Sequence, residues 1–353
     1  MLALLAGLWA GLDRLGWALP PLTPSLPALH GPLMASGFLG TLIGLERAVA
    51  LRRPWAYAVP ALSGVSALGL AVGLPAQSAV LAVLASLGLV GVFAVVYRIQ
   101  PALHTATMGA GAVAWLVAAS LQAAGLPVFR SVPFWGAFLV LTITGERLEL
   151  SRLGRLPRTG LIAYLGSAAL YAAGVAVTAV RPDAGVRIAG VGMVALALWL
   201  FRYDIARRTV QIAGLPRFIA VSLLSGYLWL AVAGVLWGAV GGERAGLSYD
   251  AMLHALFLGF VVTMIFAHAP VIFPAVLGGP LLFHPRFYGH LVLLQGSLLL
   301  RVAGDMAGWL PGRLWGGLLN VLALLLFLAN TALAAGAAGP SPGGDIGRRS
   351  VGE

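Results

Sequence analysis

Long apolar runs, separated by short polar or charged breaks, recur along the whole chain. Many runs approach the ~20 residues that a helix needs to cross the ~30 Å hydrocarbon core of a bilayer. The breaks fall at proline, glycine or clustered arginine, as in LRRP at 51–54 and RYDIARR at 202–208. The pattern predicts an all-helical bundle of about twelve membrane spans, at 2–20, 30–50, 54–74, 78–97, 103–124, 131–150, 159–180, 185–203, 216–240, 249–273, 287–309 and 313–336.

The arginines indicate how these spans are oriented. Connections after even-numbered spans carry most of them, including Arg52, Arg53, Arg152, Arg155, Arg207 and Arg208. Short arginine-rich loops remain on the cytoplasmic side of a membrane. We therefore expect both termini in the cytoplasm and a single multi-pass domain over 1–336 in the inner (cytoplasmic) membrane. A short disordered Gly/Pro-rich tail at 337–353 is expected to follow.

Composition agrees with a membrane protein and excludes several classes of site. Hydrophobic residues make up 60% of the 353 residues and charged residues only 9%, which is too little charge to surround a soluble domain of this size. The net charge of +11 comes from scattered arginines, so no nucleic-acid partner is expected. Cysteine is absent, which excludes disulfides, thiolate metal sites, iron–sulfur clusters and covalently attached c-type haem.

Three of the six histidines follow a leucine at the start of a predicted span: His30, His104 and His254. Met34 and Met108 come four residues after His30 and His104, one helical turn along the same face. A His–Met pair is a soft, neutral ligand set that suits Cu(I) or haem iron. These three histidines and two methionines are therefore the candidate metal ligands.

His254 and His268 lie in one predicted span, fourteen positions apart. At ~1.5 Å and ~100° per residue, they are about 21 Å apart along the axis and within about 40° of one face. The predicted depths pair His30 with His254 and His104 with His268, the arrangement in which b-type cytochromes hold stacked haems. The competing interpretation is that a neutral histidine at a helix start hydrogen-bonds a carbonyl near the headgroups.

Arg301 and Asp305 lie one turn apart in the eleventh predicted span. The guanidinium of Arg301 suits a haem propionate, and an ion pair with Asp305 is the structural alternative. His284 and His290 lie in or beside the loop FHPRFYGH and are expected to be solvated.

Two similar acidic–basic pairs, Glu46-Arg47 and Glu146-Arg147, end the second and sixth predicted spans. We expect ion pairs that reach the interface or tie these two helices together. A proton-entry site or a quinone site is the functional alternative.

Three segments resemble signatures of the NnrS-type family of twelve-span bacterial membrane proteins. His254-Ala-Leu-x-x-Gly-x-x-x-Thr-Met264 resembles the family's C-terminal signature, and His30-x-x-x-Met34-x-x-Gly-Phe38 resembles its N-terminal one. Leu300-Arg301-Val302 resembles a further family feature. Pro32 and Leu33 stand where the family has a second histidine and a glutamate. The resemblance implies a protein that binds haem b, with copper as a second metal, and that acts in nitric oxide metabolism or protection from nitrosative stress.

Several functions remain open on these residues. A haem with one open side binds nitric oxide, whereas bis-histidine haems carry electrons from a donor such as quinol. A secondary transporter without a cofactor has the same span count and Gly/Pro-interrupted helices, although no acidic residue is expected at mid-membrane. An assembly factor for a larger redox complex is the remaining alternative.

Overall fold

The computed structural model describes residues 1–336 apart from 21–22, 152–153, 155 and 278–282, so the expected tail at 337–353 lies outside the described residues. The described chain is helical and contains no strand. The elements, in chain order, are α1 (Leu2–Leu15), the 3-10 turn η1 (Leu26–Leu29), α2 (His30–Pro32), the π-helical η2 (Leu33–Leu39), α3 (Gly40–Leu51), the 3-10 turn η3 (Pro54–Tyr57), α4 (Ala58–Ala71), α5 (Pro75–Ile99), α6 (Leu103–Ala123), α7 (Val128–Ser151), α8 (Arg158–Val177), α9 (Pro182–Tyr203), α10 (Ala206–Thr209), α11 (Leu215–Val240), α12 (Leu247–His254), the π-helical η5 (Ala255–Val262), α13 (Thr263–Leu277), α14 (Phe287–Met306) and α15 (Leu310–Gly336).

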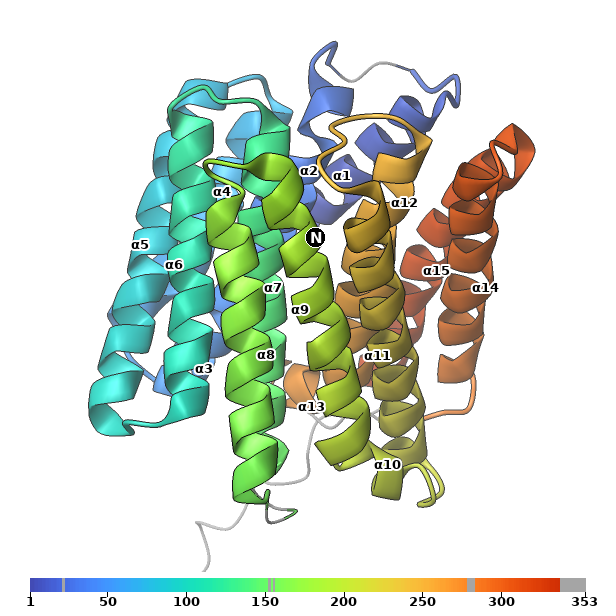
Figure 1. Ribbon diagram of the computed structural model, residues 1–353. Coiled ribbons are helices and arrows are strands. Elements are labelled where there is room, and N and C mark those ends of the chain that lie inside the picture. Colours follow the sequence, from blue (N-terminus) through green and yellow to red (C-terminus); the bar gives the residue numbers. More distant parts are fainter. Residues whose placement is uncertain (21–22, 152–153, 155, 278–282, 337–353) are drawn as a thin grey trace, which may run out of the picture.

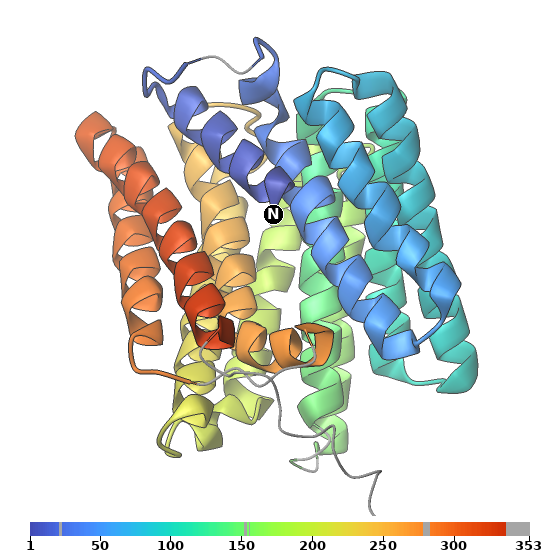
Figure 2. The ribbon, with the colours of Figure 1, turned by 180° about the vertical axis from the view of Figure 1, so that it is seen from behind.

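The long helices lie side by side between an upper and a lower face, as oriented in Figure 1 and seen from behind in Figure 2. Helices that follow one another in the chain are mostly neighbours in space, as α5 with α6, α6 with α7, α8 with α9 and α14 with α15. α2 and α12 lie at the upper face, and α10 lies at the lower face (Figure 1). The positive-inside rule would assign the lower face, where α10 carries Arg207 and Arg208, to the cytoplasm.

Nine helices in the described part of the chain are long and apolar enough to cross a bilayer. These nine helices overlap nine of the twelve predicted spans, and the first, third and eleventh predicted spans have no counterpart among them. α1 and α4 have 14 residues each, about 21 Å at ~1.5 Å per residue, which is shorter than the ~30 Å hydrocarbon core. α14 has 20 residues but includes the polar residues His290, Gln295, Arg301 and Asp305. The fold is that of a multi-pass membrane protein, while the expected count of about twelve spans is not confirmed.

α7 is the central helix of the bundle. In its most apolar stretch 78% of the residues are buried within the protein, compared with 28% for α5 and α8. Close packing elsewhere depends on small residues, because lipid provides no hydrophobic drive for helices to associate. A Cβ added at Gly190 of α9 would lie 2.6 Å from the carbonyl oxygen of Gly234 in α11. Only glycine at this crossing allows the two backbones to approach so closely.

Candidate functional site

His30 and His254 lie next to each other in the upper half of the bundle. Their ring centroids are 6.2 Å apart, and the ring planes are inclined by 22°. Two imidazoles that bind one metal ion at about 2.0–2.1 Å each have ring centroids no more than about 6.5 Å apart. His30 is the first residue of α2 and His254 is the last residue of α12, so the fold brings two segments that are far apart in the sequence to a separation that one ion can bridge.

The backbone holds one nitrogen of each imidazole. Nδ1 of His30 is 2.7 Å from the carbonyl oxygen of Gly7 in α1, and Nδ1 of His254 is 2.8 Å from that of Asp250. A carbonyl oxygen only accepts, so Nδ1 carries the proton and donates it, while Nε2 keeps its lone pair. Such a hydrogen bond fixes the orientation of a histidine whose other nitrogen binds a metal.

Two glycines of α1 leave room for the candidate ligands. A Cβ at Gly11 would lie 3.0 Å from Cε1 and 3.1 Å from Nδ1 of His30. A Cβ at Gly7, one turn earlier, would lie 2.6 Å from Sδ of Met34. The short helix α1 therefore presents a flat face against which both side chains pack, and its Gly7 carbonyl accepts the hydrogen bond from His30.

A π-helical segment follows each of the two histidines: η2 comes three residues after His30, and η5 begins directly after His254. π-Helical turns are rare and occur frequently at functional sites. Hydroxyl groups bind the carbonyls of both segments. Ser63 donates to the Ser36 carbonyl at 2.9 Å, and Thr263 donates to the Leu258 carbonyl at 3.5 Å. These bonds stabilise the widened turns beside the two imidazoles.

Arg301 does not form the ion pair with Asp305 that the i,i+4 spacing suggests, and that alternative is wrong. Its Nε and Nη2 donate to Oδ2 of Asp250 at 3.0 and 2.8 Å. Asp305 instead lies 3.1 Å from Nε of Arg313. Oδ1 of Asp250 is also 3.4 Å from Nδ1 of His254. One partly buried carboxylate therefore connects the imidazole of His254 with the guanidinium of Arg301, and this carboxylate determines where Arg301 lies.

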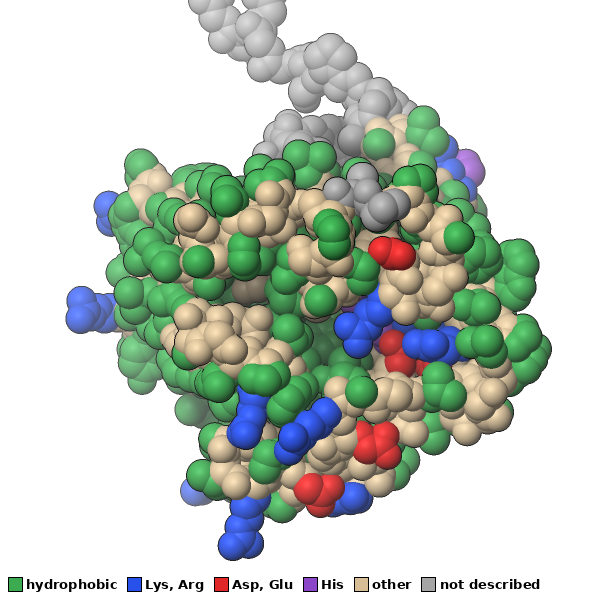
Figure 3. All heavy atoms as spheres, turned by 90° about the horizontal axis from the view of Figure 1, so that it is seen from above, with side chains coloured by type: hydrophobic (Ala, Val, Ile, Leu, Met, Phe, Trp, Pro, Cys, Tyr) green, Lys and Arg blue, Asp and Glu red, His purple; other side chains and the backbone are tan. Residues whose placement is uncertain are grey.

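The two histidines line the upper cavity, which has a volume of about 310 Å³, within the ~300–1,000 Å³ typical of small-molecule and cofactor sites. Met34, Arg14, Arg301 and Trp135 also line this cavity. Trp135 is 1% exposed, and its Nε1 has no hydrogen-bond partner within the described part of the chain. Figure 3 shows the upper face hollowed near its centre, with an apolar floor and arginine and acidic side chains beside it.

The groups around the upper cavity fit a haem. A haem iron needs at most two protein ligands, because the porphyrin supplies four nitrogens, and His30 and His254 offer one Nε2 each. Arg14 and Arg301 are cations of the type that binds propionate carboxylates. Met34 adds a thioether, which suits Cu(I). Among the described residues, no group of three or more His, Asp or Glu side chains is close enough to hold a metal ion.

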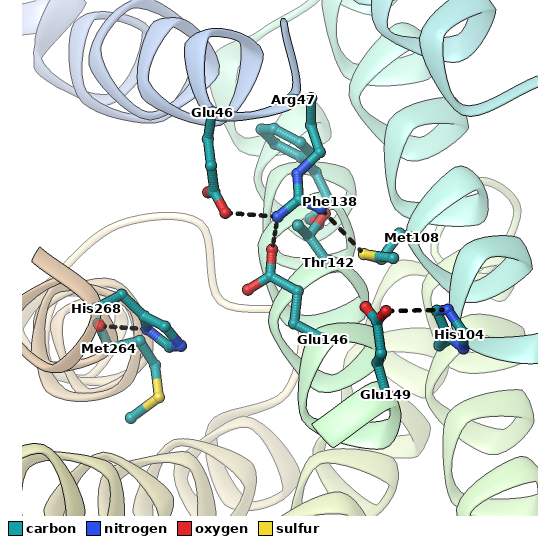
Figure 4. A network of polar contacts seen from close by, with 10 residues as sticks. All are labelled: Glu46, Arg47, His104, Met108, Phe138, Thr142, Glu146, Glu149, Met264 and His268. Carbon is teal, nitrogen blue, oxygen red and sulfur yellow. Dashed lines mark hydrogen bonds and ion pairs between the residues drawn. The ribbon is translucent and has the colours of Figure 1, made fainter. Parts of the chain in front are cut away.

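The structure does not bring His104 and His268 together as the predicted depths suggest. Figure 4 shows them on α6 and α13, on opposite sides of the α7 residues Glu146 and Glu149. Nε2 of His104 lies 3.6 Å from Oε1 of Glu149. Nδ1 of His268 lies 2.7 Å from the Met264 carbonyl oxygen. Expecting a second bis-histidine site from helix depth alone fails, because depth does not fix the direction around the bundle.

Met108 has an electropositive neighbour, since Nη1 of Arg47 lies 4.0 Å from its Sδ. It is buried in α6, where a Cβ at Gly145 of α7 would lie 2.7 Å from its Cγ. Met108 therefore lies in the packed interface of α6 and α7, away from the upper cavity.

The acidic–basic pairs at the lower ends of α3 and α7 do tie these helices together. Nη2 of Arg47 donates to Glu46 at 2.6 Å and also to Glu146. Arg147, next to Glu146, binds a different partner: its Nε and Nη2 donate to the two carboxylate oxygens of Asp204 at 2.7 and 2.9 Å. The Arg147 and Asp204 side chains are 4% and 0% exposed, so this pair is a buried anchor between α7 and the end of α9.

His290 is not a solvated loop residue, and that prediction is wrong. It is 1% exposed in α14, with its ring 4.7 Å from that of Phe266 in an edge-on arrangement. Its Nδ1 lies 3.2 Å from Nδ2 of Asn330. His284 is exposed in the connection before α14, as expected, and its Nδ1 accepts from the Arg286 backbone at 3.1 Å. Both histidines have local structural partners outside the upper cavity.

Sequence reasoning missed Asp250, Trp135 and the two glycines of α1. Asp250 precedes His254 by four residues, a spacing that places a carboxylate one turn away on the same helix face. Gly7 and Gly11 have the same spacing, which predicts a small-residue face. Trp135 carries no signal of its own, because tryptophans are common in membrane helices.

The chain was compared with known proteins. No curated protein and no solved structure matches it. The family model described as "Domain of unknown function (DUF8744)" matches residues 1–336. Because this match covers nearly the entire sequence, the chain belongs to the DUF8744 family.

Proposed function

We propose that this protein binds haem b in the upper cavity, where His30 and His254 would hold the iron. The observation that carries the proposal is the pair of imidazoles at 6.2 Å, each with Nδ1 bonded to a backbone carbonyl. Histidine is costly inside a membrane unless it meets a partner or a cavity. Here two rings are oriented by the backbone and line one cavity.

The surrounding residues would orient and neutralise the haem. Arg14 and Arg301 supply positive charge for two propionates, and Trp135, whose Nε1–H has no hydrogen-bond partner among the described residues, lines the same cavity. Asp250 holds Arg301 and lies beside Nδ1 of His254, so it keeps both groups in place. A bound haem would supply one-electron transfer, and two histidine ligands favour this function over permanent gas binding.

The link to nitric oxide and other nitrogen oxides rests on the NnrS-like segments around His30 and His254. Copper is the second candidate metal, because Met34 lines the same cavity as both histidines. Two imidazoles and a thioether form a ligand set for Cu(I). If Met34 is a copper ligand, Met34→Leu would reduce the copper content of the purified protein and leave its haem content unchanged.

An optical spectrum of the detergent-solubilised protein, with and without dithionite, tests the proposal. We expect a Soret band that is lost in His30→Ala and in His254→Ala. His284→Ala, in the exposed connection before α14, is the matched control and should retain the band. A colourless protein with the circular dichroism of an intact helical fold would overturn the haem assignment. Displacement of the Soret band by nitric oxide would support the nitrogen-oxide link.

A further inference from the structure

A second cavity, here the lower cavity, lies below the upper one, among α1, α3, α4, α7, α13 and α15. Its volume is about 590 Å³. Apolar side chains line most of it, among them Leu42, Ile43, Leu68, Ile265 and Leu328. Val65, Leu68 and Leu2 are 55%, 44% and 64% exposed, so part of this lining belongs to the apolar outer surface of the bundle. A molecule dissolved in the bilayer can therefore enter the lower cavity from the side.

Polar groups from three helices lie in the lining: Glu46 of α3, Glu146 of α7 and His268 of α13. Figure 4 shows the two carboxyl groups and the imidazole around one region of the bundle. Because Nδ1 of His268 is bonded to the Met264 carbonyl, its Nε2 keeps a lone pair for a ligand. Carboxylate oxygens and this nitrogen are all hydrogen-bond acceptors. The lining therefore selects a head group that donates hydrogen bonds.

Charge narrows the choice of occupant. The only cation bonded to the two carboxylates among the described residues is Arg47, which binds both Glu46 and Glu146. Because two carboxyl groups already share this one guanidinium, it leaves no unpaired positive charge to bind a phosphate or carboxylate head group. Anionic phospholipids and fatty acids are thus poor occupants. A neutral head group with hydroxyl donors on an apolar tail suits both the acceptors and the walls.

The lower cavity adjoins the upper one. Phe38 and Leu39 of η2 line both cavities. His254 and His268, which line the upper and lower cavities respectively, belong to the same continuous helix, Leu247–Pro274. An occupant of the lower cavity would be separated from the upper cavity by a thin layer of side chains.

We propose that the lower cavity binds a lipid-soluble quinol, with its ring hydroxyls donating to Glu46, Glu146 and His268 and its tail along the apolar walls. The acceptor groups, the pairing of Arg47 with both carboxyl groups and the access from the bilayer carry the binding assignment. The choice of a redox-active molecule among neutral hydroxylated lipids rests on the proposed function, since a quinol is a natural electron donor beside a haem.

Photolabelling in nanodiscs of phosphatidylcholine tests this binding. The probe is an azido-benzoquinol with a decyl tail, and labelled peptides are identified by mass spectrometry. We expect labels on α3, α7 or α13, removed by excess unlabelled decylubiquinol but not by phosphatidylglycerol. Competition by phosphatidylglycerol at the same concentration as decylubiquinol would overturn the proposal, because it would identify an anionic-lipid site.

Gly64 of α4 provides a variant that fills the lower cavity. It lines the cavity, and a Cβ there would meet only Oγ1 of Thr41, at 3.9 Å. We expect Gly64→Leu to weaken quinol binding about tenfold, which corresponds to ~1.4 kcal/mol. Gly166→Leu is the matched control, because Gly166 is exposed on α8 with nothing within 4 Å of its added Cβ. Equal labelling of the two variants would overturn the proposed position.

Two further variants separate this proposal from the haem assignment. Glu46→Gln removes a charge but keeps an oxygen for Arg47, and we expect it to weaken quinol labelling. His30→Ala changes only the upper cavity, so quinol labelling should persist when the Soret band is lost. Specific quinol labelling of a wild-type protein without a Soret band would support the quinol site in the lower cavity and refute the haem proposal. Unchanged labelling of Glu46→Gln would refute the role of the carboxylates.

Discussion

Gly11 of α1 lies directly against the imidazole of His30: a Cβ at position 11 would be 3.0 Å from the ring carbon Cε1. A side chain there must displace the ring or push α1 away. We therefore expect Gly11→Val to reduce haem content by about tenfold through the lost orientation of one ligand. Haem content would be measured as the ratio of Soret to protein absorbance. Gly91→Val is the control, since nothing lies within 4 Å of its added Cβ; an equal loss there would contradict the explanation.

Asp250 connects His254 with Arg301, so its charge should matter although it is not a ligand. Asp250→Asn is expected to weaken haem affinity about 10–100-fold, the usual effect of losing a group that orients a metal ligand. Titration of the haem-free protein with haemin would measure the affinity. Asp183→Asn is the matched control, because Asp183 pairs with Arg187 on the exposed part of α9. Similar haemin affinity for Asp250→Asn and wild type would argue against this role.

Trp135 offers a test of whether a ligand fills the upper cavity. Its Nε1–H has no partner among the residues that the structure describes, so Trp135→Phe removes a donor without breaking any of their hydrogen bonds. We expect little change in thermal unfolding without ligand, and a loss of about 1 kcal/mol in haemin affinity, the typical net value of one hydrogen bond. A lower melting temperature with unchanged haemin affinity would assign Trp135 to packing alone.

The Arg147–Asp204 pair should be important for stability rather than for binding. Both side chains are buried, and Asp204 also accepts a hydrogen bond from the Ala206 backbone at 2.7 Å. Removing one partner leaves an uncompensated charge, so Asp204→Ala should lower the free energy of unfolding by about 3–5 kcal/mol. The double variant Arg147→Met/Asp204→Ala should lose less than the sum of the single changes. Additive losses in chemical unfolding would show that the two groups do not interact.

Helix positions were largely predictable from the sequence, because spans depend on the length and polarity of local runs. Two of the three exceptions also have local causes: α1 ends at Gly16 in a left-handed turn, and polar residues interrupt the apolar run of the continuous helix α14. Which side chains from different helices lie next to each other was harder to predict from the sequence. The depths of His30 and His254 were consistent with their approach, but the same reasoning paired His104 with His268, which α7 separates. The sequence singled out Arg301 but not its partner, since Asp250 comes from another helix.

In both His254 and His268, Nδ1 donates a hydrogen bond to the backbone carbonyl one turn earlier in the same helix. Each imidazole therefore moves together with that helix. A ligand that rotates or tilts the helix at one cavity changes the geometry at the other. Linkage then requires reciprocity: whatever factor occupancy of the lower cavity applies to affinity in the upper, the upper applies to the lower. A displacement of this helix at one cavity would therefore move a lining side chain of the other.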